Sequence, residues 1–162
     1  MRILLLASLL LVVSCGANRF AQDIVPPGWQ RIDADGYFGF YLPASMQLRS
    51  TTRCEECAWG STYADERISL HATYTSWNEG YTAEYLNRQP EYQRQIAEIG
   101  GKKAKIESWR SSEPPNGFAY FAEARFYGDD GKLVARLSAW CKLQSDVDIA
   151  KQIFRTVGSF KR

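Results

Sequence analysis

Period-two alternation of apolar and polar residues constrains the fold of this chain more than any other feature. In the segment 67–77 this alternation places the apolar side chains of Ile68, Leu70, Ala72 and Tyr74 on one face of an extended chain. The segment 118–127 has the same period, but the face opposite its apolar one is charged in the middle and aromatic at both ends. We therefore expect antiparallel strands with a core on one face and partial cover on the other.

Turn signals divide the rest of the chain into hairpins and short helices. Paired strands are predicted at 29–33 and 37–42, 58–63 and 67–77, 95–99 and 103–109, and 118–127 and 132–141. A long irregular polar stretch is expected from 44 to about 56, and a short helix from 81 to about 89, stopped by Pro90. The order predicts an α+β domain, an antiparallel β-sheet flanked by helices.

The last helix has the clearest end signals. Ser145 is its candidate N-cap, acidic residues follow in the first turn, and Gly158 is its candidate stop. We expect it to dock on the sheet, with Phe160 packing beside it in a short final strand. Its apolar face holds Ile149, Ala150, Ile153, Phe154 and Val157.

The N-terminus carries a secretory signal. One cation precedes an apolar run that is too short to span a bilayer, and the run ends in Val12-Val13-Ser14-Cys15. These four residues resemble the processing box of bacterial lipoproteins, in which the cysteine receives a diacylglyceryl group and becomes the acylated N-terminus. The resemblance implies a signal peptide at 1–14, a lipidated tether at 15–27 and one domain at 28–162. An ordinary signal peptide with an incidental Cys15 is the alternative.

The location follows from this anchor. Two or three acyl chains hold a protein at a bilayer, so we expect a lipid-anchored protein on the extracytoplasmic side of the cell membrane or outer membrane. Gly16 after the cysteine resembles the default outer-membrane signal. The remaining chain of about 150 residues has the length of a single domain. A formal charge of +2 gives no sign of a nucleic-acid partner.

A second resemblance concerns the domain itself. The run Asp35-Gly36-Tyr37-Phe38-Gly39-Phe40-Tyr41-Leu42-Pro43 resembles an early strand of PsbP-like proteins, the extrinsic photosystem II subunits and their bacterial relatives. The closing segment 150–160 resembles the last helix and "SF" strand of that family. The resemblance implies a PsbP-like α/β/α sandwich, and an accessory or binding role without a catalytic motif. The region of Cys54 and Cys57 departs from the photosynthetic members, so a photosystem role is not carried over.

The cysteines of the exported domain are Cys54, Cys57 and Cys141, and an oxidising compartment favours one disulfide among them. The pairing stays open, with a slight preference for a link through Cys141 because a longer closed loop stabilises more. Cys54 and Cys57 also have the spacing of a thiol-disulfide oxidoreductase, but two glutamates between them disfavour the thiolate. A zinc site of these three cysteines with His71 is the weaker alternative, so no metal or cofactor is expected.

Other catalytic patterns are missing from the sequence. There is no nucleophile elbow, no phosphate loop, and the paired carboxylates Glu55-Glu56 and Asp129-Asp130 fall in predicted turns, where they point toward water. A basic strip of Lys102, Lys103, Lys105 and Arg110 could face anionic headgroups, although a solvated strand face is the simpler interpretation. We therefore expect a non-enzymatic binding or accessory lipoprotein with an unidentified protein partner. A thiol-disulfide oxidoreductase and a small-ligand carrier with an aromatic groove are the alternatives.

Overall fold

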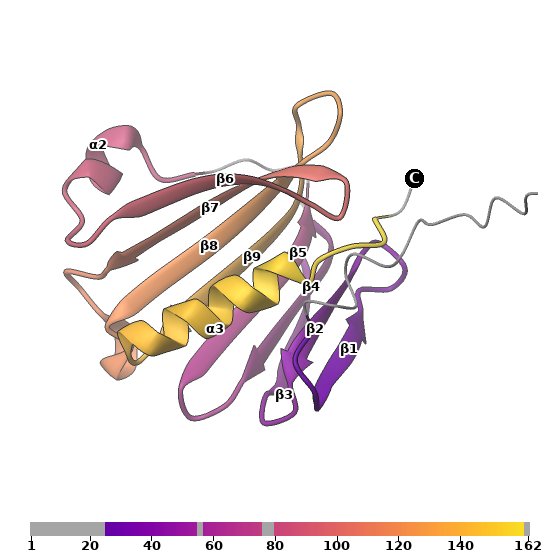
Figure 1. Cartoon of the computed structure of the whole chain (residues 1–162), viewed down its shortest axis with the longest axis horizontal. Helices are drawn as coiled ribbons and strands as arrows, with labels where there is room; N and C mark the ends of the chain where they lie inside the picture. The colour runs from indigo at the N-terminus through magenta and orange to yellow at the C-terminus, as the bar shows by residue number, and fades with distance from the viewer. Residues whose placement is uncertain (1–24, 55–56, 76–79, 161–162) are drawn as a thin grey trace, which may run out of the picture.

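A seven-stranded antiparallel sheet forms the body of the domain (Figure 1). It is seen in a computed structural model that describes residues 25–54, 57–75 and 80–160. The strand order is β3-β4-β5-β9-β8-β7-β6, and β1 and β2 form a separate two-stranded ribbon. The strands are β1 (Trp29–Asp33), β2 (Gly39–Pro43), β3 (Gln47–Cys54), β4 (Cys57–Ala64), β5 (Ile68–Thr75), β6 (Gln93–Ile99), β7 (Lys102–Arg110), β8 (Tyr120–Tyr127) and β9 (Leu133–Cys141); the helices are α2 (Ala83–Asn87), the 3-10 turn η1 (Pro115–Gly117) and α3 (Gln144–Arg155).

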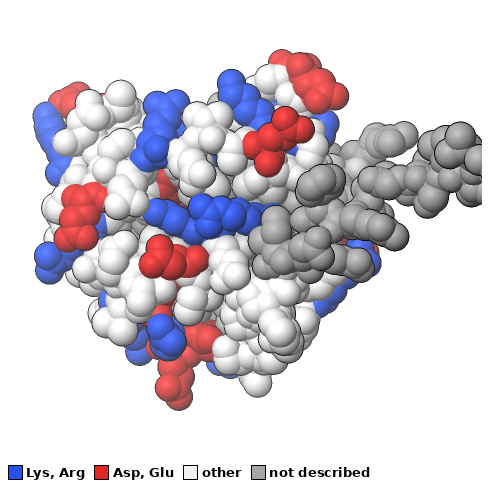
Figure 2. All heavy atoms as spheres, viewed as in Figure 1, with Lys and Arg blue, Asp and Glu red and all other residues white. Residues whose placement is uncertain are grey.

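The main core lies between the sheet and α3, which crosses one sheet face (Figure 1). Ile153 and Phe154 of α3 are fully buried, and Val157 just beyond the helix is 1% exposed, so the predicted docking of this helix is confirmed. Polar contacts extend the docking to the sheet edge, because Lys151 donates to Gln93 of β6 at 2.9 Å. A band of basic side chains crosses the middle of this face in the space-filling view (Figure 2).

The opposite face of the sheet is also covered, as the pattern of 118–127 predicted. Every β8 residue from Phe121 to Phe126 is buried, whichever face its side chain takes. Near one end of that face, Leu86 of α2 packs with Trp109 and Phe121 in a second, smaller apolar cluster. The domain therefore has an α+β architecture with cover on both sheet faces.

The two ends of α3 differ from the sequence prediction. The helix begins at Gln144, with Leu143 rather than Ser145 as the N-cap. The prediction of Ser145 was wrong because Asp146 supplies the cap from inside the helix: its carboxylate accepts the Leu143 N–H at 3.0 Å. The C-cap is Thr156, so the helix ends before Gly158.

Gly158 has a different role. Its backbone forms an isolated antiparallel bridge to Gly39 of β2, which ties the chain end to the ribbon. Gly100, in the β6–β7 turn, approaches the Val157–Gly158 backbone so closely that a Cβ would collide with it. Phe160 follows the bridge and packs against Phe38 and Phe126, at centroid distances of 5.9 and 5.7 Å, without forming the expected final strand.

The irregular stretch expected from 44 to about 56 was also wrong, because it contains β3. This strand lies at the sheet edge and pairs only with β4. Its residues from Gln47 to Thr51 are all exposed, including Leu48 at 55%. A run of edge-strand residues that are all exposed has no apolar alternation, which explains why periodicity missed the segment 47–51.

Candidate functional site

A groove of about 810 Å³ lies where the described chain enters the domain. Its walls come from Pro26, the β1–β2 ribbon, β3, the β4–β5 turn and α3. We call it the α3 groove. It is lined by Pro26, Trp29, Pro43, Ser45, Gln47, Arg49, Asp65, Glu66, Arg67, Ile68, Ile149 and Gln152.

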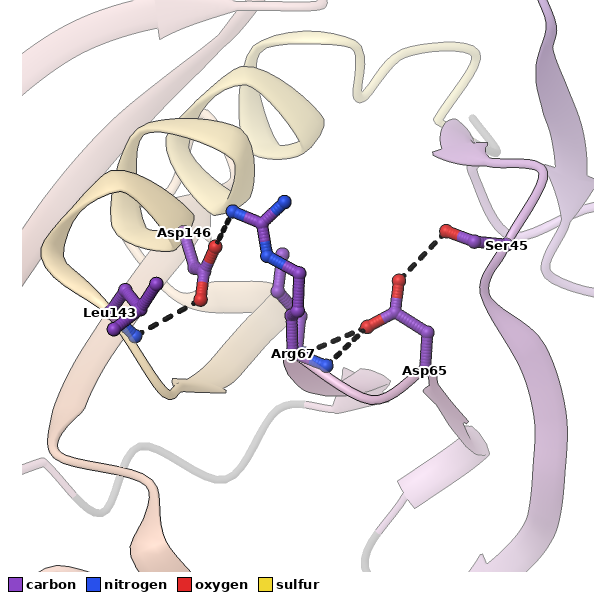
Figure 3. Close-up of polar contacts among 6 residues, drawn as sticks. Ser45, Asp65, Arg67, Leu143 and Asp146 are labelled. Atoms are coloured by element: carbon purple, nitrogen blue, oxygen red, sulfur yellow. Dashed lines mark hydrogen bonds and ion pairs between the residues drawn. The ribbon is translucent and has the colours of Figure 1, made fainter.

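Asp65 shapes one wall of the groove through the β4–β5 turn (Figure 3). One carboxylate oxygen accepts the backbone N–H groups of Arg67 and Ile68, at 2.8 and 2.9 Å. The other accepts the hydroxyl of Ser45 at 2.8 Å. Burial acts to raise the pKa of Asp65, but these hydrogen bonds and the nearby Arg67 charge outweigh it, so the pKa lies below its ordinary value. The carboxylate stays ionised and holds the turn.

Asp146 links the groove wall to the start of α3 (Figure 3). Its side chain is fully buried and forms an ion pair with Arg67, whose side chain is 52% exposed. Its second oxygen accepts the Leu143 N–H. Both carboxylates in Figure 3 are thus engaged in structural hydrogen bonds, and neither is arranged as a general acid or base.

The groups that remain for a ligand are those on the open walls. Arg49 and Glu66 are exposed, while Trp29, Ile149 and Gln152 are half-buried. Aromatic and aliphatic surface with a few polar groups suits binding of a ligand or an extended partner segment. No sequence signal could have found this groove, because its residues come from separate elements with no common spacing.

A second cluster of polar groups lies on the sheet face opposite α3, in cross-strand rows. Glu107 and Glu123 lie directly opposite each other on β7 and β8, and the next row holds Lys105, Arg125 and Arg136. Arg125 forms an ion pair with Glu123 and lies 4.0 Å from Glu107. Arg125 and Glu107 are diagonal neighbours on adjacent strands, and their attraction offsets the repulsion between like charges within each row.

These charges are enclosed. The side chains of Glu107, Glu123 and Arg125 are 1–5% exposed, and a Cβ on Gly80 would overlap the Arg125 guanidinium. Burial acts to lower the pKa of Arg125, but Glu123 and Glu107 raise it above the ordinary value. Burial and a 2.5 Å hydrogen bond to Glu107 raise the pKa of Tyr92 to about 12. Glu107, Glu123 and Arg125 line neither the α3 groove nor the second hollow described below, whereas Lys105 lines the second hollow.

The structure separates Cys141 from the other two cysteines of the domain. Cys141 is a free, fully buried thiol at the end of β9, where burial raises its pKa to about 12. It lies opposite Ile68, whereas Cys57 lies opposite Thr75 at the other end of β5. That strand separation of about 20 Å far exceeds the reach of a disulfide, about 7 Å between Cα atoms. The preference for a link through Cys141 does not hold in this fold.

Cys54 and Cys57 are direct partners across the β3–β4 hairpin. Directly opposed residues have Cα atoms about 4.5–5.5 Å apart, a spacing that permits a disulfide. Their side chains, the Glu55-Glu56 pair between them, and Cys15 all lie outside the described residues. A Cys54–Cys57 link and lipidation of Cys15 therefore stay predictions.

The remaining candidates do not converge. His71 is half-buried, accompanied by Thr62 with Nδ1 and Oγ1 3.0 Å apart, and burial and then Arg136 lower its pKa. It takes the sheet face opposite to Cys141, so the zinc alternative does not assemble, and the described residues contain no potential metal cluster. Asp129 and Asp130 are exposed in the β8–β9 turn, as expected.

Comparison with solved structures identifies the fold. The chain resembles the solution structure of cyanobacterial PsbP (CyanoP) from Synechocystis sp. PCC 6803, with a TM-score of 0.51 and 12% identity over 90% of this chain and 97% of that one. No protein-family model and no curated protein matches the sequence. The domain is therefore PsbP-like in fold, as the run 35–43 predicted. Within the described ranges, no helix combines the length and apolar content that a membrane span requires.

Proposed function

We propose that this chain is a lipid-anchored extracytoplasmic protein whose PsbP-like domain has a non-enzymatic, accessory role. The Val12–Cys15 box supports the anchor, and the fold supports the role through the PsbP-like resemblance. The α3 groove is the site at which the domain would bind a segment of an envelope protein.

The observation that carries this proposal is the state of the groove's polar groups. Asp65 and Asp146 are engaged by backbone N–H groups and Arg67, which leaves binding surface but no reactive pair. Pro26 lies on the groove wall, so the tether ends beside the site. A tether at that point holds the groove near the bilayer and its proteins, which favours even weak association.

Site-directed photo-crosslinking in native membranes tests the proposal. A photoreactive residue at Glu66, on the groove, should yield a discrete protein adduct, whereas the same residue at Ser112, exposed in the β7–β8 connection, should not. Filling the groove with Gln152→Trp should remove the adduct while thermal unfolding stays unchanged. Equal crosslinking from both positions, or an adduct that survives Gln152→Trp, would exclude the groove as the binding site.

A further inference from the structure

A second hollow, of about 640 Å³, lies on the sheet face opposite α3, next to edge strand β6. Strands β6, β7 and β8 supply its floor, and the β8–β9 turn forms one wall. We call it the basic hollow. Its lining residues are Arg94, Ile96, Lys103, Lys105, Tyr127, Gly128, Asp129 and Gly131.

Strand register explains why cations gather there. Lys103 and Lys105 are two residues apart on β7, so their side chains share a face, and β6 places Arg94 and Ile96 beside them. Lys102 and Arg110 fall on alternate positions and take the other face. The basic strip expected from sequence is thus divided between two faces, and Arg94, which was not part of it, joins the hollow.

The exposed charge of the hollow is mainly positive. Arg94 and Lys103 are exposed, and within the described part of the chain neither forms an ion pair. Lys105 lies 3.0 Å from Glu107 and keeps 19% of its side chain exposed. Three carboxylates oppose this charge: Asp129 is paired with Lys102 at 3.2 Å, Glu98 lies opposite Lys103, and the buried Glu107 lies opposite Arg94. Among the described residues, Arg94 and Lys103 form no ion pair with any of the three, so these two cations remain to receive an anion.

Apolar surface accompanies these cations. Ile96 is 51% exposed, and Tyr127 is half-buried on the far side of the hollow. A phosphate ester with an attached glycerol and acyl chain has matching chemistry, since its phosphate is anionic and the adjoining part apolar. A free acidic peptide would match the cations but leave Ile96 in water.

We propose that the basic hollow binds the anionic headgroup of a membrane phospholipid. The tether makes this occupant available, because the chain from Cys15 to Pro26 spans at most about 40 Å when extended. That reach rests on the lipid anchor of the proposed function, whereas the affinity of the hollow for a headgroup does not. Binding would turn β6 toward the bilayer and give the tethered domain a fixed orientation.

Vesicle co-sedimentation of the unacylated chain from Gly16 to Arg162 tests the hollow without the anchor. All described strands and helices lie within this part of the chain. Binding is expected to vesicles of phosphatidylcholine with 30% phosphatidylglycerol, to weaken with salt, and to be absent with phosphatidylcholine alone. Arg94→Gln with Lys103→Gln should lower the partition coefficient about tenfold or more, since each cation near an anionic surface contributes.

A matched control removes two exposed cations elsewhere, with Arg88→Gln and Lys142→Gln, and should bind like the wild type. Ile96→Ser should weaken vesicle binding without changing its salt dependence. Equal loss in the control and hollow variants would overturn the proposal, as would binding that ignores lipid charge. A wild type that binds a polyglutamate peptide but no anionic vesicle would also overturn it and assign the hollow to an acidic protein.

Discussion

At the scale of single residues, the strongest constraint is the enclosed cation on the face opposite α3. Arg125 is 5% exposed and pairs with Glu123, with Glu107 4.0 Å away. Ser138 donates to Glu123 at 3.1 Å, and Tyr92 donates to Glu107. Buried charges are tolerated only when they are paired and hydrogen-bonded, so this cluster depends on its central guanidinium.

Replacing that guanidinium gives the first prediction. Arg125→Met should lower the free energy of unfolding by about 3–5 kcal/mol, because two buried carboxylates lose their common partner. Adding Glu123→Gln and Glu107→Gln to Arg125→Met should restore part of the loss, since no fully enclosed charge remains and the cations that lose these partners, Lys105 and Arg136, are 19% and 27% exposed. Urea unfolding of Arg125→Met, the triple variant and the wild type measures both effects. An unchanged midpoint in Arg125→Met would mean that the cluster is solvated rather than enclosed.

Asp65 gives a prediction about pH. Its pKa is lower in the folded chain than its ordinary value of about 3.9, so the folded state binds this proton less readily than the unfolded state. Its contribution to stability is therefore present above pH 4 and is lost as pH falls through the folded pKa. Asp65→Asn should be less stable than wild type at pH 7 and should lose less stability between pH 5 and 3 in urea titrations. Parallel curves for the two proteins would contradict this.

At the scale of secondary structure, elements with one buried face could be predicted and others could not. The β8–β9 hairpin follows directly from apolar residues at every second position. Helix α3 follows from apolar residues spaced three to four positions apart. Residues 47–51 of β3 are all exposed, so residues such as Leu48 gave no pattern. The cap of α3 was missed because the hydrogen bond comes from Asp146, inside the helix, and Ser145 is the more usual choice.

The docking of α3 gives the third prediction. Phe154 is fully buried between the helix and the sheet, so Phe154→Ala should lower the free energy of unfolding by about 3–5 kcal/mol. Lys151→Ala is the control, because it removes only the partly exposed hydrogen bond to Gln93 and should cost less than about 1 kcal/mol. Thermal and urea unfolding distinguish the two. Equal melting temperatures for Phe154→Ala and wild type would show that α3 is not part of the core.

At the scale of the whole molecule, the candidate sites depend on tertiary placement that the sequence does not contain. Cys141 and Cys57 are both strand residues, yet sheet register puts them at opposite ends of β5. The α3 groove joins Trp29 to Ile149, and the basic hollow joins Arg94 to Tyr127. Only local features, such as the Cys15 box and the cations of β7, could be recognised from the sequence alone.

The final prediction concerns the relation between anchor and domain. All described elements fall between Trp29 and Arg155, and the groove takes only Pro26 from the preceding tether. The lipid should therefore determine location without contributing to the fold.

Cys15→Ser should abolish acylation, detected by intact-mass spectrometry of protein from native membranes, and should leave the precursor unprocessed or release it from the bilayer. The melting temperature of the domain should stay within about 1 °C of the wild-type value, since no described helix or strand includes Cys15. A wild-type mature form that begins elsewhere without acyl groups would refute lipidation. A lower melting temperature in Cys15→Ser would instead mean that the anchor segment packs on the domain, with the α3 groove beside Pro26 as the place to look for that contact.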